Sequence, residues 1–306
     1  MYYRIILGSQ NRYLAECLQN NCIGVNFDIH QDLTEQLPDN WREFNAAFIP
    51  VFLQNRPDRT RIAAGLACGA LWTVSKGLRI GDIVLCPNGE RQYLLGEITG
   101  DYQYQDGSVM PHRRPVRWLD RRINRDDMSQ ELRNSSGAVL TVCSLERFSD
   151  EVNRLIGGAQ LEQTNIDIET VENTSVFALE RHLEDFLVAN WVNTELGRDY
   201  EIYQQDGEVC GQQFPTDTGP IDILAISRDR TRLLVVELKR GRARDAVAGQ
   251  ILRYMGYVRE QLAEPHQIVE GVIIALEDDL SLRRALSVVP GVSFYRYQVN
   301  FTLNRV

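Results

Sequence analysis

Two apolar runs in the C-terminal half of the chain predict a β-hairpin. Residues 223–226 (ILAI) and 232–238 (RLLVVEL) are aliphatic and rich in β-branched side chains, and the polar segment Ser-Arg-Asp-Arg-Thr lies between them. This pattern is typical of a strand, a tight turn and a second strand. With the turn centred on Asp229 and Arg230, Asp222 lies directly opposite Glu237. A register shifted by one residue would turn Asp222 to the other face of the sheet.

Two helices are predicted beside this hairpin. One extends from Ala243 to Glu260 and the other from Val176 to Val188, and both repeat apolar side chains at helical spacing. In the upstream helix, Glu180 and Glu184 are neighbours one turn apart beside the apolar stripe. The stripes consist of Val247, Gln250, Ile251, Tyr254 and Val258 in the downstream helix, and of Leu179, Leu183 and Leu187 in the upstream one.

Two carboxylates and a lysine meet in the predicted hairpin. Glu237 and Lys239 are two residues apart, so they share one face of their strand, and Asp222 faces them from the paired strand. Mg²⁺ prefers oxygen ligands and is usually held by one or two carboxylates, with water and substrate phosphate completing its shell. A lysine beside the metal can hold or deprotonate the attacking water. The pattern favours a Mg²⁺ site for phosphodiester hydrolysis, which either Glu180 or Glu184 could reach.

The order of these motifs resembles the PD-(D/E)xK nuclease superfamily. The segments ALERHLEDFL, PTDTGPIDILA, VVELKRGRARD and GQILRYMGYV follow one another and are similar to the catalytic domain of NucS-type DNA endonucleases. The resemblance covers residues 173–306 and implies Mg²⁺, or Mn²⁺ in its place, as the cofactor.

The same resemblance implies a role for each matching residue. Asp222 and Glu237 would bind the metal, Lys239 would assist the water, and Gln250 and Tyr254 would position the DNA backbone. The spare carboxylate in the Thr-Asp-Thr-Gly-Pro-Ile-Asp stretch is the poorer match to the metal-binding aspartate. The implied catalytic residues are Asp222, Glu237, Lys239, Gln250 and Glu180, with Glu184 as the alternative to Glu180 and Asp217 as the spare.

Short strands with few helices between them characterise the N-terminal half. DIVLCP and YLLGEITGDY read as two strands joined by Asn88-Gly89, a strong hairpin signal. Further strands are predicted at 2–8, 115–119 and 139–145, which favours a small β-barrel-like module. A polar segment beginning with Gly-Gly predicts a linker. We therefore predict an α/β protein of two domains, with residues 1–155 as the first, 156–172 as the linker and 173–306 as the second.

The sequence pattern of residues 70–145 resembles that of PUA-like modules of the EVE and YTH type. The matching features are KGLRIGDIVLCP, YLLGEITGDYQY and PHRRPVRW. The resemblance implies a small β-barrel with a pocket that accepts a modified or flipped base between aromatic side chains. The alternative interpretation is that the aromatic candidates are ordinary residues of the hydrophobic core. The candidate pocket residues are Trp72, Asp101, Tyr102, Tyr104 and Trp118, with Ser75 as an alternative polar reader.

Basic residues gather in two places although the net charge is −9. The first lies between Pro111 and Arg133, and the second surrounds the predicted metal site between Arg228 and Arg253. Such patches suit phosphate contact, although the first has aspartates beside it that suit a solvated, ion-paired surface instead. The candidates for the DNA backbone are Arg113, Arg114, Arg240, Arg242 and Tyr254.

Composition excludes several classes of protein. The hydrophobic and charged fractions of 43% and 25% are those of a globular protein, and no run approaches the ~18 apolar residues that a membrane span needs. The N-terminus lacks the pattern of a signal peptide. The six cysteines form no C-x-x-C pair, so a zinc site is not expected and the cysteines read as reduced residues of a cytoplasmic protein.

Together the two halves predict a Mg²⁺-dependent DNA endonuclease. A PUA-like reader joined to a PD-(D/E)xK nuclease resembles modification-dependent restriction enzymes, which implies double-stranded DNA with a modified base as the partner. One active site per nuclease domain cuts one strand, so cutting both implies a homodimer. Two alternatives stay open: a repair endonuclease acting on mismatched or branched DNA, and a non-catalytic nucleic-acid-binding module.

Overall fold

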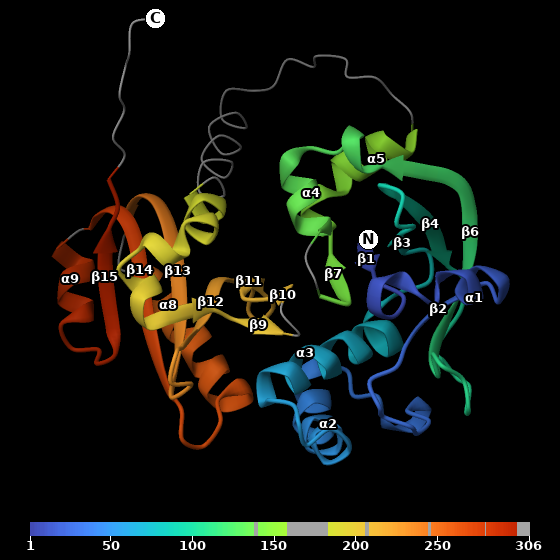
Figure 1. Ribbon diagram of the computed structural model, residues 1–306, viewed down its shortest axis with the longest axis horizontal. Helices are drawn as coiled ribbons and strands as arrows, with labels where there is room; N and C mark the ends of the chain where they lie inside the picture. Colours follow the sequence, from blue (N-terminus) through green and yellow to red (C-terminus); the bar gives the residue numbers. More distant parts are fainter. Residues whose placement is uncertain (138–139, 158–182, 206–207, 244–245, 279, 299–306) are drawn as a thin grey trace, which may run out of the picture. The chain divides into compact units, whose positions relative to one another are not determined.

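The computed structural model describes residues 1–137, 140–157, 183–205, 208–243, 246–278 and 280–298. The chain divides into two compact units, Met1–Gln163 and Thr164–Val306, and each has its own mixed sheet with helices (Figure 1). The protein is therefore of the α/β type. Most of the predicted linker, from 158 to 172, lies outside the described residues.

The N-terminal unit is built on a seven-stranded sheet. The described strands pair in the order β2-β6-β4-β3-β1-β7, and β5 pairs with β6. Only the β1–β3 pair is parallel. The strands are β1 (Tyr2–Ile5), β2 (Cys22–Val25), β3 (Ile83–Pro87), β4 (Gln92–Ile98), β5 (Gln103–Tyr104), β6 (His112–Asn124) and β7 (Val142–Ser144).

The predicted hairpin of the N-terminal unit is present. β3 pairs antiparallel with β4, with Pro87 opposite Tyr93, and Gly89 in the connection has a φ of 82°. Glycine adopts this left-handed conformation at no steric cost. The side-chain oxygen of Asn88 accepts the backbone N–H of Glu90 at 2.8 Å and closes the turn. The Asn-Gly signal thus located a real turn.

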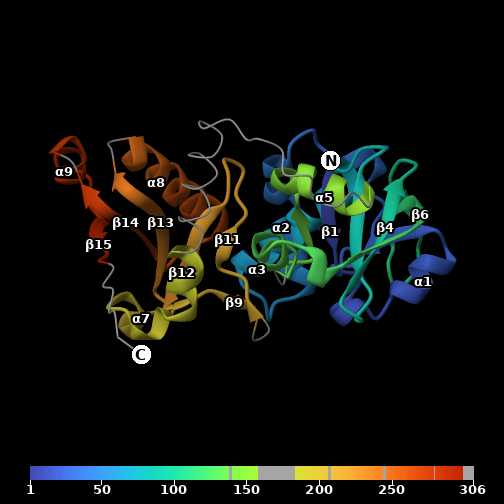
Figure 2. The ribbon, with the colours of Figure 1, turned by 90° about the horizontal axis from the view of Figure 1, so that it is seen from above.

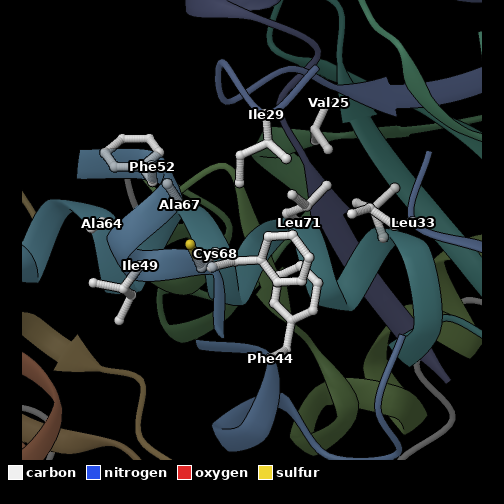
Figure 3. Packing of buried hydrophobic residues seen from close by; sticks show 12 residues of the cluster. Val25, Ile29, Leu33, Phe44, Ile49, Phe52, Ala64, Ala67, Cys68 and Leu71 are labelled. Carbon is white, nitrogen blue, oxygen red and sulfur yellow. The ribbon is translucent and has the colours of Figure 1, made fainter. Parts of the chain in front are cut away.

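Helices make up more of the N-terminal unit than the sequence pattern predicted. Its α-helices are α1 (Leu14–Gln19), α2 (Trp41–Asn55), α3 (Arg61–Trp72), α4 (Gln130–Ser136) and α5 (Ser149–Gly157). The helix α2 was not anticipated, although Phe44, Phe48 and Phe52 recur at i, i+4 and i+8. These phenylalanines are buried against α3 in an aliphatic and aromatic core (Figure 3).

The second unit has a six-stranded sheet of mixed direction. Its described strands run in the order β11-β12-β13-β14-β15, and β8 also pairs with β12. The β12–β13 pair is antiparallel, whereas β13, β14 and β15 are parallel to one another (Figure 2). The strands are β8 (Tyr200–Ile202), β11 (Gln212–Phe214), β12 (Ile221–Ser227), β13 (Arg232–Ala243), β14 (Ile268–Asp278) and β15 (Val292–Arg296), beside a small hairpin of β9 (Gln204–Gln205) and β10 (Glu208–Val209).

A helix connects the parallel strands β13 and β14 and packs on both of them. This helix, α8 (Ala246–Tyr257), buries Val247, Ile251 and Tyr254, so the predicted apolar stripe is confirmed. The shorter helices are α7 (Leu196–Asp199) and α9 (Leu280–Leu286), and residues 183–189 are also helical. Within the described chain, no helix is long and apolar enough to cross a membrane.

Candidate functional site

The register of the β12–β13 hairpin brings two carboxylates together. Ile223 pairs with Val236, so the next pair along the ladder sets Asp222 opposite Glu237. Four residues, 228–231, connect the two strands, and Arg230 takes a left-handed φ of 63° at the centre of the turn. The hairpin therefore has the register that the sequence predicted. Residues directly opposite each other on antiparallel strands project from the same face of a sheet.

Lys239 completes the group from the same strand as Glu237. Its Nζ donates to Oε1 of Glu237 at 2.6 Å, while Oδ2 of Asp222 accepts the backbone N–H of Leu238 at 2.7 Å. The Glu237 side chain is 2% exposed and that of Lys239 27%. A buried carboxylate is costly unless it is paired, and Lys239 provides that pairing while still reaching solvent. The arrangement joins a buried anionic centre to an accessible cation.

Gln250 and Tyr254 lie beside the carboxylates. Nε2 of Gln250 donates to the Tyr254 hydroxyl at 3.3 Å, one turn away on α8. Burial raises the pKa of Tyr254, and the negative charges of Glu237 and Asp222 raise it further. A Cβ added to Gly219 would lie 3.2 Å from the same hydroxyl, and Gly219 has a φ of 118°. The helix and the loop before β12 thus approach the site together.

Glu184 reaches the site from the upstream helical segment. It is 5% exposed, and its Oε2 accepts from Nε2 of Gln213 at 2.6 Å. The same Gln213 nitrogen donates to Oδ1 of Asp222 at 3.2 Å, so one amide links the two carboxylates. Glu180 lies outside the described residues. Of the two candidate glutamates, Glu184 is therefore the one with a described connection to Asp222.

Gln212 and Gln213 were missed by the sequence reasoning. They form β11 with Phe214, and Pro215 separates this strand from the Thr-Asp-Thr-Gly-Pro-Ile-Asp stretch. Two consecutive amides in a short strand carry no periodic signal, and a polar pair is typical of an exposed turn. Their role follows only from the pairing of β11 with β12.

The side chains present suit a hard divalent cation. Asp222 and Glu237 supply carboxylate oxygens on one face, which are the ligands Mg²⁺ takes from protein, with water and phosphate completing the shell. Among the described residues, no three His, Cys, Asp or Glu side chains gather closely enough to hold an ion. The third carboxylate, Glu184, is separated from Asp222 by the Gln213 amide.

Basic residues lie near the end of β13, the strand that carries Glu237 and Lys239. Arg242 is exposed near the end of β13, where the pairing with β14 shifts register between Lys239 and Arg242. Arg240 lies within that irregular stretch, and Arg244 lies outside the described residues. An exposed arginine close to an anionic centre suits contact with a neighbouring phosphate.

The N-terminal unit contains a pocket of about 480 Å³. Lys76 and Arg79 are exposed and basic at its wall, and Asp101 is exposed and acidic. Ser75 is 3% exposed, and its hydroxyl has no hydrogen-bond partner within the described part of the chain. Polar groups buried without partners are rare in folded proteins and call for an explanation. A ligand in this pocket would provide one.

A buried histidine fixes the tyrosine of this pocket. Nε2 of His112 lies 2.7 Å from the Ile29 carbonyl, which can only accept, so this nitrogen carries the proton. Burial lowers the pKa of His112, which keeps the ring neutral. Nδ1 therefore accepts the hydroxyl proton of Tyr102 at 2.8 Å. Burial also raises the pKa of Tyr102 to about 12, so Tyr102 lines the pocket as a neutral, oriented ring.

The other candidate aromatics lie apart from one another. Trp72 packs on the α2–α3 core and donates its indole N–H to the Pro38 carbonyl at 3.1 Å. Trp118 packs on a second core and donates to the Cys17 carbonyl at 3.3 Å. Tyr104 lies against the His112 ring with centroids 5.3 Å apart. Of the predicted pocket residues, the pocket itself is lined by Asp101 and Tyr102, with Ser75.

Two arginines predicted for the DNA backbone are buried within the N-terminal unit. Arg113 is 7% exposed and pairs with Glu16 at 3.0 Å. Arg114 is 3% exposed and donates to the carbonyls of Gly100 at 2.9 Å and Leu78 at 2.8 Å. Arg114 also lines the pocket. The exposed arginines of β6 are instead Arg117, Arg121 and Arg122.

Comparison with known proteins gives partial matches. Residues 3–146 match a family model described as a domain of unknown function (DUF8426). No curated protein matches the chain. Solved structures similar to it include an EndoMS–dsDNA complex, at 15% identity and a TM-score of 0.34, covering 72% of this chain and 66% of that one.

Two further solved structures are similar to the chain. A repair endonuclease from Pyrococcus abyssi matches at 14% identity and a TM-score of 0.30, covering 69% of this chain and 66% of that one. EndoMS in its apo form matches at 19% identity and a TM-score of 0.28, covering 39% and 45%. The chain thus spans less than two thirds of the length of each of these proteins.

Proposed function

We propose that this protein is a metal-dependent DNA endonuclease whose C-terminal domain is of the PD-(D/E)xK type. The observation that carries the proposal is the pairing of Asp222 with Glu237 across the hairpin, with Lys239 bonded to Glu237 at 2.6 Å. A purely structural ion pair would also explain a buried carboxylate. Here, however, Gln250 and Tyr254 of α8 lie beside the same carboxylates, which a structural ion pair does not require. Carboxylates, lysine, amide and hydroxyl in one place suit the binding and hydrolysis of a phosphodiester.

Each of these residues has a part in the proposed reaction. Asp222 and Glu237 hold Mg²⁺ or Mn²⁺, with Glu184 as the supporting carboxylate. When bound, the metal polarises the phosphoryl oxygen and lowers the pKa of a water. Lys239, which reaches from Glu237 toward solvent, holds the attacking water as a hydrogen-bond donor. In its neutral form, with its own proton first released to solvent, its Nζ accepts the proton of that water. Gln250 and Tyr254 donate hydrogen bonds to the phosphate backbone.

We further propose that the N-terminal unit is a PUA-like reader of a modified base in double-stranded DNA. The pocket supports this proposal because it combines the ring of Tyr102, the carboxylate of Asp101 and the Ser75 hydroxyl. Extruding a base costs a few kcal/mol, and stacking on an aromatic ring contributes about 1–3 kcal/mol. Lys76 and Arg79 at the wall suit the flanking phosphates.

Reading and cutting together make a modification-dependent restriction enzyme. Each chain carries one set of Asp222, Glu237 and Lys239, so each cuts one strand at a time. Cleavage of both strands needs two copies of the chain on the DNA, and we propose a homodimer with isologous contacts.

The test is cleavage of matched duplexes by the full-length chain. Unmodified, cytosine-modified, adenine-modified and mismatched DNA are incubated with Mg²⁺ or Mn²⁺, and nicks are resolved on denaturing gels. Asp222→Asn and Glu237→Gln remove a metal ligand with little change of shape. Asp217→Asn is the matched control, because it neutralises the spare carboxylate of the loop before β12.

The result separates the alternatives. Cutting confined to modified DNA, lost in Asp222→Asn and kept in Asp217→Asn, supports the restriction enzyme. Cutting confined to the mismatch keeps the nuclease and makes it a repair enzyme. Equal activity in the wild type and both ligand variants would refute the active site, and no cutting of any duplex would favour a binding module.

A further inference from the structure

The Gln213 amide lies between the carboxylates of Asp222 and Glu184. Its Nε2 donates to Oδ1 of Asp222 at 3.2 Å and to Oε2 of Glu184 at 2.6 Å. A primary amide has two N–H donors on one nitrogen, so a single atom satisfies both bonds. The geometry therefore has one donor nitrogen bridging oxygens from two carboxylates that belong to different elements.

The backbone of β11 is bent to achieve this bridge. Gln212 pairs with Ile223 and Phe214 pairs with Ile221, so Gln213 lies opposite Asp222. Successive side chains of a regular strand point to opposite faces, yet Gln212 and Gln213 both donate to Glu184. Gln213 has a φ of 49°, a left-handed value that few residues other than glycine adopt. Observed strain of this kind at a candidate site points to a role for the residue.

Like charges in one site repel and disfavour the ionised form of both groups. Gln213 offsets this repulsion between Asp222 and Glu184 by hydrogen bonding to both. Its bonds occupy Oδ1 of Asp222, one of the oxygens that a metal would take. The amide stabilises the two carboxylates together, and it would compete with a metal for this oxygen.

We infer that Gln213 is a positioning residue that occupies the place of the metal and must give up Asp222 when the metal binds. This inference rests on the proposed function, since it concerns the same metal site. Binding of the metal alone is then weak, and it is strengthened by the additional oxygen ligands that substrate phosphate supplies. By thermodynamic linkage, the metal strengthens DNA binding by the same factor.

The experiment measures Mn²⁺ binding by titration calorimetry on the full-length chain, and thermal stability with and without Mn²⁺. Gln213→Met removes the donor and keeps the length of the side chain. Gln213→Asn keeps the amide but shortens the side chain, which withdraws the amide from Asp222 and Glu184. It replaces Gln213→Met in the experiment if that variant does not fold. Gln212→Met is the matched control, because Gln212 donates to Glu184 and Asp185 at 2.9 Å each and has no described bond to Asp222.

Gln213→Met is expected to bind Mn²⁺ more tightly than the wild type and to be less stable without it. The Mn²⁺ dissociation constant falls about tenfold, as loss of one competing bond to a charged group implies, while the metal-free protein melts at a lower temperature. Gln212→Met lowers the melting temperature without tightening Mn²⁺ binding. A residue with a purely structural role would lower stability and leave the affinity unchanged or weaker, and that result would overturn the inference.

The failure of this inference is distinct from that of the proposed function. If the wild type binds Mn²⁺, Asp222→Asn abolishes the binding and Gln213→Met does not tighten it, the inference alone is refuted. If Mn²⁺ binds the wild type and Asp222→Asn equally, or binds neither, the metal site itself is refuted.

Discussion

Asp222 bonds to the strand that carries its two partner residues: its Oδ2 accepts the Leu238 backbone N–H at 2.7 Å. Leu238 lies between Glu237 and Lys239, so this bond ties the first carboxylate to the second and to the lysine. The carboxylate of Asp222 therefore holds the geometry of the site, and in the proposed reaction it also offers an oxygen to the metal. Substitutions of Asp222 that keep or remove the acceptor for Leu238 can therefore separate the structural role of this side chain from its proposed role in catalysis.

We predict that Asp222→Asn and Asp222→Ala differ in stability although both abolish cleavage. The asparagine carbonyl can still accept the Leu238 N–H, whereas alanine leaves that N–H without its acceptor, which costs about 1–3 kcal/mol. Urea unfolding of the full-length variants measures the difference. Equal free energies of unfolding would show that the bond to Leu238 contributes nothing.

We predict that Lys239→Arg does not preserve activity. The sequence contains only two lysines, Lys76 and Lys239, among 33 basic residues, so lysine at the site contrasts with the general use of arginine. A guanidinium keeps the charge but is not deprotonated in proteins, so it cannot take a proton from the water. Turnover should fall roughly 100-fold, as for loss of a general acid–base group.

Single-turnover cleavage at saturating metal measures this effect. Lys76→Arg is the matched control, since it makes the same change at the other lysine of the chain. Full activity in Lys239→Arg would assign Lys239 an electrostatic role only.

We predict that Ser75→Ala weakens the discrimination of the N-terminal unit between modified and plain DNA without lowering its stability. The Ser75 hydroxyl is buried in the pocket wall and has no partner among the described residues, so its removal breaks no internal bond. The free energy of unfolding should change by less than about 0.5 kcal/mol.

Ser136→Ala provides the contrast, because the Ser136 hydroxyl is equally buried but bonds to the Tyr93 hydroxyl at 3.0 Å. That variant should lose about 1 kcal/mol and keep its DNA preference. Competition binding with modified and plain duplexes, beside urea unfolding, tests both variants. Unchanged discrimination in Ser75→Ala would remove Ser75 from the reading pocket.

We predict that the N-terminal unit loses stability in mild acid because of His112. Burial lowers the pKa of His112 below its ordinary value of 6.5. As pH falls below 6.5, the unfolded chain binds a proton that the folded chain does not, so the free energy of unfolding falls. A single such group contributes at most about 1.4 kcal/mol per pH unit, and the stabilisation is fully present above the unfolded value.

Urea unfolding between about pH 7.5 and about pH 5.5 measures this slope. His112→Gln should flatten it, and the exposed His266→Gln in the other unit should leave it as in the wild type. An unchanged slope in His112→Gln would assign the pH dependence to groups other than His112.

Local sequence patterns predicted the elements of the candidate active site well. Alternation and turn composition determined the hairpin and its register, and the recurrence of Val247, Ile251 and Tyr254 determined the face of α8, because both are decided by residues close in sequence. The same holds for the turn at Asn88 and Gly89. The helix α2 had a comparable signal in its phenylalanines, which the sequence reading did not use.

The tertiary structure alone decided what depends on strands and helices far apart in the chain. Pairing of β11 with β12 brings Gln213 between Asp222 and Glu184, and no local pattern marks that amide. Of the neighbouring arginines of β6, Arg113 and Arg114 are buried and donate hydrogen bonds within the unit, whereas Arg117 is exposed. The sequence by itself determined which residue types lie on one face of the hairpin in the second unit, since residue type and spacing along one strand are local. Which side chains join them was decided by packing, because hydrogen-bond partners are set by distance in space.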